Sequence, residues 1–293
     1  MVIVLIKMKK ISKYLSATLI SFGLFAYSSY AASHPYFEQG LTLLRAGNNQ
    51  AAIEAFSQDI LEEPNNPDAY YNRAIARKAL GDNQGAIEDY TKAIELDPIF
   101  IDAYLNRGNA RAAVGDYQGE IDDETKAIKL SSDSNNHNLD LAYVNRGDAR
   151  EILGDKHGAI SDYNEAIKYN PSYADAYYNR GIAHRALGDN QSAIDDYTKA
   201  IEIDPSDSNA FYNRANVYLT LGDNKHAIDD YTKTISLDST DADAFYNRGL
   251  ARKITGDKAG AINDYKQASL LYQKQGNSKW HKKALQQIES IQF

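Results

Sequence analysis

The sequence predicts an all-α protein made of stacked pairs of antiparallel helices. Three observations lead to this fold class. One motif recurs along most of the 293 residues, which is the mark of a repeat architecture. Each copy carries apolar and small residues at helical spacing. A Gly-Asp dipeptide, or a near variant, divides each copy into two such runs, so that each copy reads as a helical hairpin.

The repeats align on a tetrad of the type "YNRG". Six copies begin at Ala69, Ala103, Ala142, Ala176, Ala210 and Ala244, and a degenerate copy begins at Pro35. All copies are 34 residues apart except the third and fourth, which are 39 apart. We therefore predict seven units within 33–275: 33–66, 67–100, 101–134, 140–173, 174–207, 208–241 and 242–275, with an insertion at 135–139.

The unit 174–207 shows how each hairpin is delimited. Gly188 is expected to end the first helix, because glycine tolerates the left-handed backbone of a helix terminus. Asp189 can cap the amides of the second helix and favour its positive end. Pro205 cannot continue a helix and closes the unit. One hairpin cannot bury its own apolar face, so the units must stack.

This pattern resembles the tetratricopeptide repeat (TPR) family. In the unit 174–207 the signature positions hold Tyr177, Arg180, Gly181, His184, Ala193, Tyr197, Ala200 and Pro205. Arg180 and His184 depart from the aliphatic and aromatic residues that the family uses there. The resemblance implies a right-handed superhelical solenoid whose first helices line a concave face that binds proteins or peptides. The style of the repeats, like the N-terminal signal sequence described below, looks bacterial and cyanobacterium-like.

The arginine at the family's aliphatic position is matched by an aspartate 16 residues later. The arginines are Arg73, Arg107, Arg146, Arg180, Arg214 and Arg248, and the aspartates are Asp89, Asp123, Asp162, Asp196, Asp230 and Asp264. The first unit has Gln39 and Ala55 at these two positions and so lacks both charges. A partly buried arginine needs a partner, and a carboxylate suits its two-pronged geometry. We predict ion pairs between the helices, within a unit or to its neighbour.

The family geometry also indicates which residues face the groove. The predicted peptide-binding residues are Tyr71, Asn72, Leu105, Asn106, Asn145, Tyr178, Asn179, Ile182, Arg185, Tyr212, Asn213, Asn216, Tyr246, Asn247, Leu250 and Lys253. Tyrosines offer rigid contact area, and asparagine amides can bond a peptide backbone. In the alternative interpretation, the asparagines tie neighbouring units together and the tyrosines are packing residues.

Family members that grip the acidic C-termini of chaperones use a clamp of lysines and arginines. The equivalent places here hold Tyr71, Leu105, Tyr178 and the acids Asp68, Asp102, Asp175 and Asp243. The clamp is absent, and an acidic lip should instead attract basic or neutral segments.

The third unit is irregular. Glu120 replaces a small alanine and Glu124 replaces a packed aromatic residue. One interpretation is a loosened joint with a more solvated second helix. The other is a cation site formed by Glu120, Asp123 and Glu124, since hard cations prefer clustered carboxylates.

The residues 276–293 predict a C-terminal helix that covers the last repeat, with Asn277 or Ser278 as its cap. Its apolar face would hold Trp280, Ala284, Leu285, Ile288 and Ile291. Its polar side would hold Lys279, Lys282, Lys283, Gln286 and Gln287. A partner-binding amphipathic helix is the alternative.

The N-terminal residues 1–31 predict a secretory signal peptide, with Met8 as a possible true start. A basic region is followed by the apolar stretch "YLSATLISFGLFAYSSYA" and a small-x-small site that ends at Ala31. Cleavage near Ala31 would leave an exported protein, periplasmic or secreted, with no membrane span. An uncleaved segment would approach the roughly 17–25 residues that cross a bilayer and would act as an anchor.

Composition limits the function classes. The net charge of -8 and the lack of a basic stripe argue against a nucleic-acid partner. The chain has no cysteine, hence no disulfide. No catalytic set, phosphate loop or metal-ligand spacing appears, so no cofactor is expected. We predict a non-enzymatic scaffold or adaptor that organises or assembles a complex outside the cytoplasm by binding a protein or an extended peptide. An exported ligand- or cation-binding protein that uses the third repeat is the alternative. The oligomeric state is left open.

Overall fold

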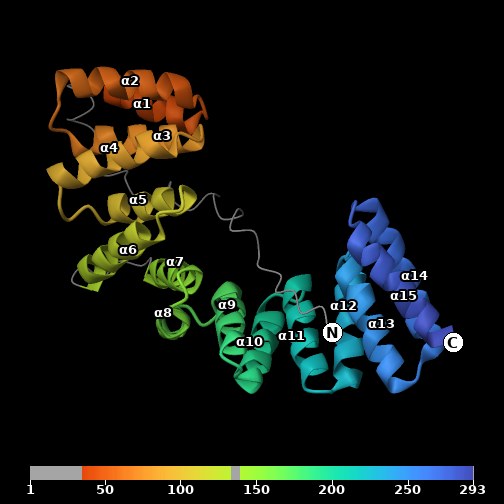
Figure 1. The fold of residues 1–293 in the computed structure, drawn as a ribbon. Coiled ribbons are helices and arrows are strands. Elements are labelled where there is room, and N and C mark those ends of the chain that lie inside the picture. The colour runs from red at the N-terminus through yellow and green to blue at the C-terminus, as the bar shows by residue number, and fades with distance from the viewer. Residues whose placement is uncertain (1–34, 133–138, 293) are drawn as a thin grey trace. The chain divides into compact units, whose positions relative to one another are not determined.

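The computed structural model describes residues 35–132 and 139–292, and over these ranges it contains fifteen α-helices and no strand. Successive helices pair as antiparallel hairpins (Figure 1). The predicted all-α fold class is confirmed. The predicted signal peptide, 1–31, and residues 135–138 of the predicted insertion lie outside the described ranges.

The described chain forms two compact units. The helices of the N-terminal unit are α1 (Pro35–Arg45), α2 (Asn49–Glu62), α3 (Pro67–Ala79), α4 (Asn83–Leu96), α5 (Ile101–Ala113), α6 (Tyr117–Ser132), α7 (Leu139–Ile152) and α8 (Lys156–Tyr169). Those of the C-terminal unit are α9 (Ala174–Ala186), α10 (Asn190–Ile203), α11 (Ser208–Thr220), α12 (Asn224–Leu237), α13 (Ala242–Thr255), α14 (Lys258–Lys274) and α15 (Ser278–Gln292).

The turn inside each hairpin has the predicted chemistry. Gly188 follows α9 with a φ of +83°, a conformation that a side chain would strain. Asp189 accepts a hydrogen bond from the Ser192 amide at 3.2 Å and so caps α10. The second helix ends at Ile203, just before Pro205. Glycine, aspartate and proline therefore begin and end the helices as the sequence indicates.

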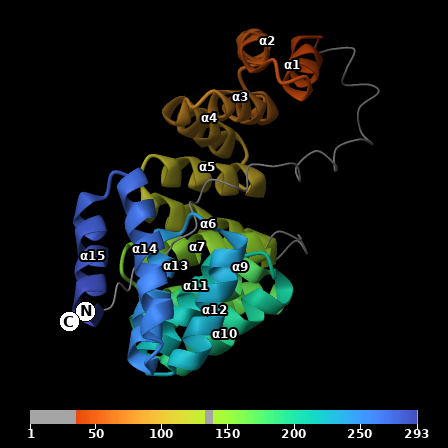
Figure 2. The same cartoon turned by 90° about the vertical axis from the view of Figure 1, so that its right-hand side faces the viewer.

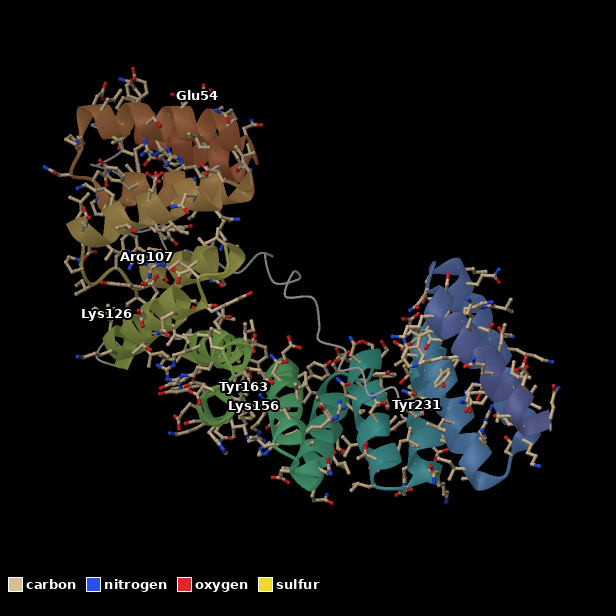
Figure 3. The ribbon with its side chains drawn as sticks, viewed as in Figure 1. Glu54, Arg107, Lys126, Lys156, Tyr163 and Tyr231 are labelled. Atoms are coloured by element: carbon tan, nitrogen blue, oxygen red, sulfur yellow. The ribbon has the colours of Figure 1, made fainter. Side chains whose placement is uncertain are left out.

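Most hairpins close by packing a tyrosine ring of the second helix against a small residue of the first, with Phe56 at this place in the first hairpin and Glu124 in the third. On α9, a Cβ placed on Gly181 would lie 2.9 Å from Cε1 of Tyr197, so the ring occupies the space that a side chain would need. Gly147 and Tyr163 repeat the arrangement in the N-terminal unit. Tyr163 and Tyr231 are labelled in Figure 3, and both are almost fully buried. Much of the chain's tyrosine content therefore belongs to the core.

The arginine and aspartate 16 residues apart form a bidentate ion pair within each of the six hairpins that carry them, as predicted. Arg107 on α5 (Figure 3) donates from Nε to Asp123 Oδ2 at 3.0 Å and from Nη2 to Oδ1 at 2.7 Å. Its third nitrogen, Nη1, donates to Thr91 Oγ1 of the preceding hairpin at 3.0 Å. The Asp123 side chain is only 3% exposed, so its charge is satisfied by direct bonds. The arginine thus closes its own hairpin and also bonds to the hairpin before it.

The C-terminal helix α15 packs beside α14 (Figure 2). Asn277 accepts a hydrogen bond from the Trp280 amide at 3.3 Å, so the predicted cap is present. Ala284 and Ile288 are buried, and Trp280 stacks edge-on against Tyr246 at 5.5 Å.

Three details of α15 differ from the prediction. Leu285 is 42% exposed. Lys283 Nζ lies 3.9 Å from the centre of the Trp280 ring, and Gln287 accepts a bond from Lys253. Trp280, Ala284, Ile288 and Ile291 still pack against the last repeat, so Leu285 alone of the predicted apolar face lies largely in solvent.

Candidate functional site

The predicted site residues lie on the first helices of the hairpins, and these helices give each unit a surface that we call its first-helix face. The face consists of α1, α3, α5 and α7 in the N-terminal unit and, separately, of α9, α11 and α13 in the C-terminal unit. In the N-terminal unit, the predicted residues are all partly exposed: Tyr71, Asn72, Leu105, Asn106 and Asn145. In the C-terminal unit, those that are partly exposed are Asn179, Arg185, Leu250 and Lys253, and those that are buried are Tyr178, Ile182, Tyr212, Asn213, Asn216, Tyr246 and Asn247.

Asparagines of the first-helix face bond to tyrosines of the preceding repeat. Asn106 Nδ2 donates to the Tyr71 hydroxyl at 2.8 Å, and Asn213 Nδ2 donates to the Tyr178 hydroxyl at 2.8 Å. Asn247 donates to the Tyr212 hydroxyl at 3.3 Å. At these positions the asparagine and tyrosine side chains tie neighbouring repeats together, as the second interpretation of the sequence predicted.

Two asparagines bond differently because the preceding repeat offers them no hydroxyl. Asn72 follows a repeat with Phe37 at the tyrosine position, and it donates to the Asp68 carbonyl of its own helix at 2.8 Å. Asn145 follows a repeat with Leu105 there, and it donates to Glu124 Oε1 at 3.1 Å. The pairing of tyrosine with an asparagine 35 residues later is a sequence signal that could have revealed these ties.

In the C-terminal unit these bonds extend into a buried polar layer. Tyr231 donates to Asn216 Oδ1 at 2.7 Å, and Asn247 donates to the same oxygen at 3.2 Å. Burial raises the pKa of Tyr212 and Tyr231, and the nearby Arg185 guanidinium only partly opposes the shift. Both phenols therefore stay neutral hydrogen-bonding groups. A partner on this face can contact only the residues that keep exposed surface.

The two cations among the predicted site residues of the C-terminal unit, Arg185 and Lys253, have no carboxylate partner among the described residues. Arg185 makes no ion pair there, and its Nη1 is buried without a hydrogen bond. Lys253 Nζ is held by two neutral groups of α15, Gln287 Oε1 at 3.0 Å and Ser290 Oγ at 2.9 Å. Arg185 lies on α9, whereas Leu250 and Lys253 lie on α13, so the first helices of the C-terminal unit offer one apolar and two cationic contacts.

Sequence models of one repeat family match more than half of the residues. The tetratricopeptide repeat model matches 67–100, 174–207 and 208–241, a second one matches 242–275, and a TPR repeat model matches 147–188. The chain belongs to the tetratricopeptide repeat family. The matched TPR residues leave out 33–66, the degenerate first unit, and 101–146, which holds the irregular third unit, the insertion and the start of the fourth unit.

Solved TPR structures resemble this chain. MamA is 27% identical, with a TM-score of 0.54, over 58% of this chain and 96% of its own. YrrB, described as a TPR protein with an unusual peptide-binding site, is 24% identical, with a TM-score of 0.56. The match covers 66% of this chain and 96% of YrrB. The C-terminal part of a TPR repeat-containing protein from Cytophaga hutchinsonii is 20% identical, with a TM-score of 0.70. The match covers 85% of this chain and 99% of that structure. No curated protein matches the chain.

The irregular TPR departs from the solvated second helix that one interpretation expects. Glu120 is 6% exposed and Glu124 is fully buried, because both lie on the side of α6 that packs between α5 and α7. Burial and the nearby Asp148 raise the pKa of Glu120 to about 8. Burial also raises the pKa of Glu124 well above its usual range. At neutral pH both side chains are therefore mainly protonated.

The metal interpretation of this TPR finds no support. Over 35–132 and 139–292, no three side chains of the metal-binding types are placed to hold an ion. None of the helices in these ranges is both long enough and apolar enough to cross a bilayer.

Proposed function

We propose that this TPR protein is a non-enzymatic scaffold that binds an extended segment of a partner protein along the first-helix face of its C-terminal unit. The observation that carries the proposal is made on the C-terminal unit. There, buried tyrosines and asparagines hydrogen-bond neighbouring helices to one another, while Arg185, Leu250 and Lys253 keep exposed surface. Contacts that are already ordered cost less conformational entropy on binding.

The polar residues of the face serve the scaffold rather than a reaction. The tyrosines and aspartates that could suggest catalysis recur with the repeat and bond to neighbouring helices. Chemistry needs one unique constellation of nucleophile, base and stabilising groups. Family membership and the peptide-binding site named for YrrB favour the same conclusion.

We also propose that the protein acts outside the cytoplasm, after cleavage near Ala31. The support is the basic and apolar pattern of residues 1–31. Cell fractionation and N-terminal sequencing of the mature protein test this point. A mature protein that begins at Ala32 in the envelope or the medium is expected. A cytoplasmic protein that retains its N-terminus would contradict it.

Exchange of exposed groove residues tests the binding role directly. The variant Arg185→Ala/Leu250→Ala/Lys253→Ala should lose a partner that the mature chain captures from the envelope fraction. The matched control Lys233→Ala/Lys266→Ala/Leu270→Ala removes similar residues from α12 and α14, where all three are exposed, and should keep the partner. Capture by both variants, or by neither, contradicts the proposal. Exchanging Tyr178 or Tyr212 would test packing instead, because both are buried.

A further inference from the structure

One arginine of the C-terminal unit has no partner for its charge. Arg185 lies near the end of α9 and is partly exposed. None of its guanidinium nitrogens bonds to a described residue, and only Nη1 among them is closed off from solvent. Nε and Nη2 therefore keep contact with solvent, whereas Nη1 is a buried donor that nothing fills. Such a donor in a native fold calls for an explanation.

The other arginines of the same first helices are neutralised by direct ion pairs. Arg180 on α9, Arg214 on α11 and Arg248 on α13 each bond to the aspartate 16 residues later. Arg252 donates to the aspartate of Arg248 at 2.9 Å. Arg185 is therefore the one arginine of these three helices whose charge no carboxylate of the described residues balances.

The three first helices of the C-terminal unit (Figure 1) carry few acids. α9 and α13 have one aspartate each, Asp175 and Asp243, both in the first turn, and α11 has none. Asp175 precedes Arg185 by ten residues, which is about 15 Å along a helix. The acid that follows Arg185 in sequence is Asp189, which caps α10 and lies 3.4 Å from His184 Nδ1. A positive charge thus stands on this face without a negative one to balance it.

Arg185 lies on the side of α9 that faces the next repeat. It follows Tyr178 by seven residues, or about two turns, so both side chains lie on the same side of the helix. The Tyr178 hydroxyl accepts a hydrogen bond from Asn213 of α11 at 2.8 Å. Arg185 therefore stands beside the contact between α9 and α11, on the predicted groove. Its charge partly opposes the raised pKa of Tyr212 on α11, in agreement with this placement.

We propose that Arg185 receives a carboxylate of the partner segment bound on the first-helix face of the C-terminal unit. This inference rests on the proposed function and names the chemistry of one subsite. A planar guanidinium presents its N–H donors in a fork that matches the two oxygens of a carboxylate. An aspartate or glutamate side chain carries this group, and so does the end of a chain.

This chemistry differs from what the sequence indicates for the lip. The acids at the starts of the first helices predict basic or neutral segments, whereas the charge near the end of α9 favours an acidic one. Lys253 on α13 adds a second positive charge, because its two hydrogen-bond partners on α15 are neutral. Arg185 also stands outside the positions of the clamp that other family members use, which hold residues such as Tyr178 here.

Selection from synthetic decapeptide pools against the mature chain tests the subsite. One pool has a free C-terminal carboxyl group and the other has an amidated C-terminus. A shared aspartate or glutamate in peptides from both pools is expected if a side chain binds, and enrichment confined to the free pool is expected if the C-terminus binds. Replacing the shared carboxyl group by its amide should weaken binding roughly tenfold.

Exchange of Arg185 assigns this effect to one side chain. Against Arg185→Gln, the same replacement in the peptide should change affinity by less than about twofold. Arg185→Glu should instead favour a lysine or an arginine at that place in the peptide. The control Lys266→Gln removes an exposed cation from α14 and should behave like the wild type. Because Arg185 makes no hydrogen bond to a described residue, Arg185→Gln should keep the melting temperature of the wild type.

Salt dependence gives a second measurement that needs no variant. The affinity of the wild type for the acidic peptide should fall more steeply with NaCl concentration than its affinity for the amide analogue. Equal slopes would overturn the subsite even if Arg185→Gln failed to fold.

The outcomes separate the subsite from the proposed function. The subsite is overturned, and the proposed function stands, if enriched peptides depend on Leu250 and Lys253 but share no carboxyl group. It is also overturned if Arg185→Gln keeps the preference for the acidic peptide. If no decapeptide is enriched from either pool, the proposed function and the subsite both fail.

Discussion

Removing Arg248, one of the arginines paired with an aspartate 16 residues later, should destabilise the C-terminal unit by about 3 kcal/mol. Arg248 is 11% exposed, and its partner Asp264 is fully buried. Arg248 donates to the two Asp264 oxygens at 3.0 and 2.7 Å, so Arg248→Leu leaves a buried carboxylate with less compensation. Breaking a buried pair costs about 3–5 kcal/mol. We expect the low end, because Arg252 still donates to Asp264 at 2.9 Å.

Adding Asp264→Ala should recover most of that loss. The double variant has no uncompensated carboxylate, and Arg252, whose side chain is 24% exposed, can be solvated. We expect a coupling free energy of about 2 kcal/mol between the two exchanges. The control Lys199→Ala breaks an exposed pair with Glu202 and should cost less than about 0.5 kcal/mol.

Urea unfolding followed by tryptophan fluorescence measures this effect. Trp280, the only tryptophan, packs against Tyr246 of α13 and so reports on the same unit. A loss below about 1 kcal/mol for Arg248→Leu, or a double variant as unstable as the single one, would refute the reasoning.

Three further predictions concern the fold. The unfolding free energy of the N-terminal unit should fall as pH rises from about 5 to about 8, because burial raises the pKa of Glu120 to about 8 and so disfavours its ionised form in the folded state. Thermal melts against pH should show this decline, and Glu120→Gln should make it shallower, since the raised pKa of Glu124 still contributes. Gly222→Ala should cost about 1 kcal/mol, since Gly222 has a φ of +80°, whereas an unchanged urea midpoint would argue against backbone strain. Tyr178→Phe should cost about 1–2 kcal/mol by leaving the buried Asn213 amide without its acceptor, and Tyr169→Phe, at a 52% exposed position, is the control in the same assay.

Features that depend on one hairpin could be predicted from the sequence. Gly188 and Asp189 act within a single turn, and their backbone conformation and capping follow from the chemistry of those residues alone. The Arg107–Asp123 pair also joins two helices of one hairpin, so a spacing of 16 residues was enough to indicate it. The repeat boundaries, the signal peptide and the partner remain predictions.

Features that depend on the next repeat could not be read in the same way. Tyr212 and Asn216 belong to the predicted groove, yet the adjacent helices bury them. One of the two interpretations placed Glu124 on a more solvated helix, yet its position on α6 lies between two packed helices. Lys283 was predicted to lie on the polar side of α15, whereas its ammonium group lies over the Trp280 ring.

The sequence by itself determined the fold class, the hairpins, their turns and the ion pairs within them. Helix periodicity, caps and glycine conformations are set by residues close in the chain. Only the tertiary structure decided which first-helix residues stay exposed, which asparagines tie repeats together, and that Glu120 is buried beside Asp148. Exposure depends on the side chains that the neighbouring repeat places against a residue, and that information lies more than thirty residues away in the chain.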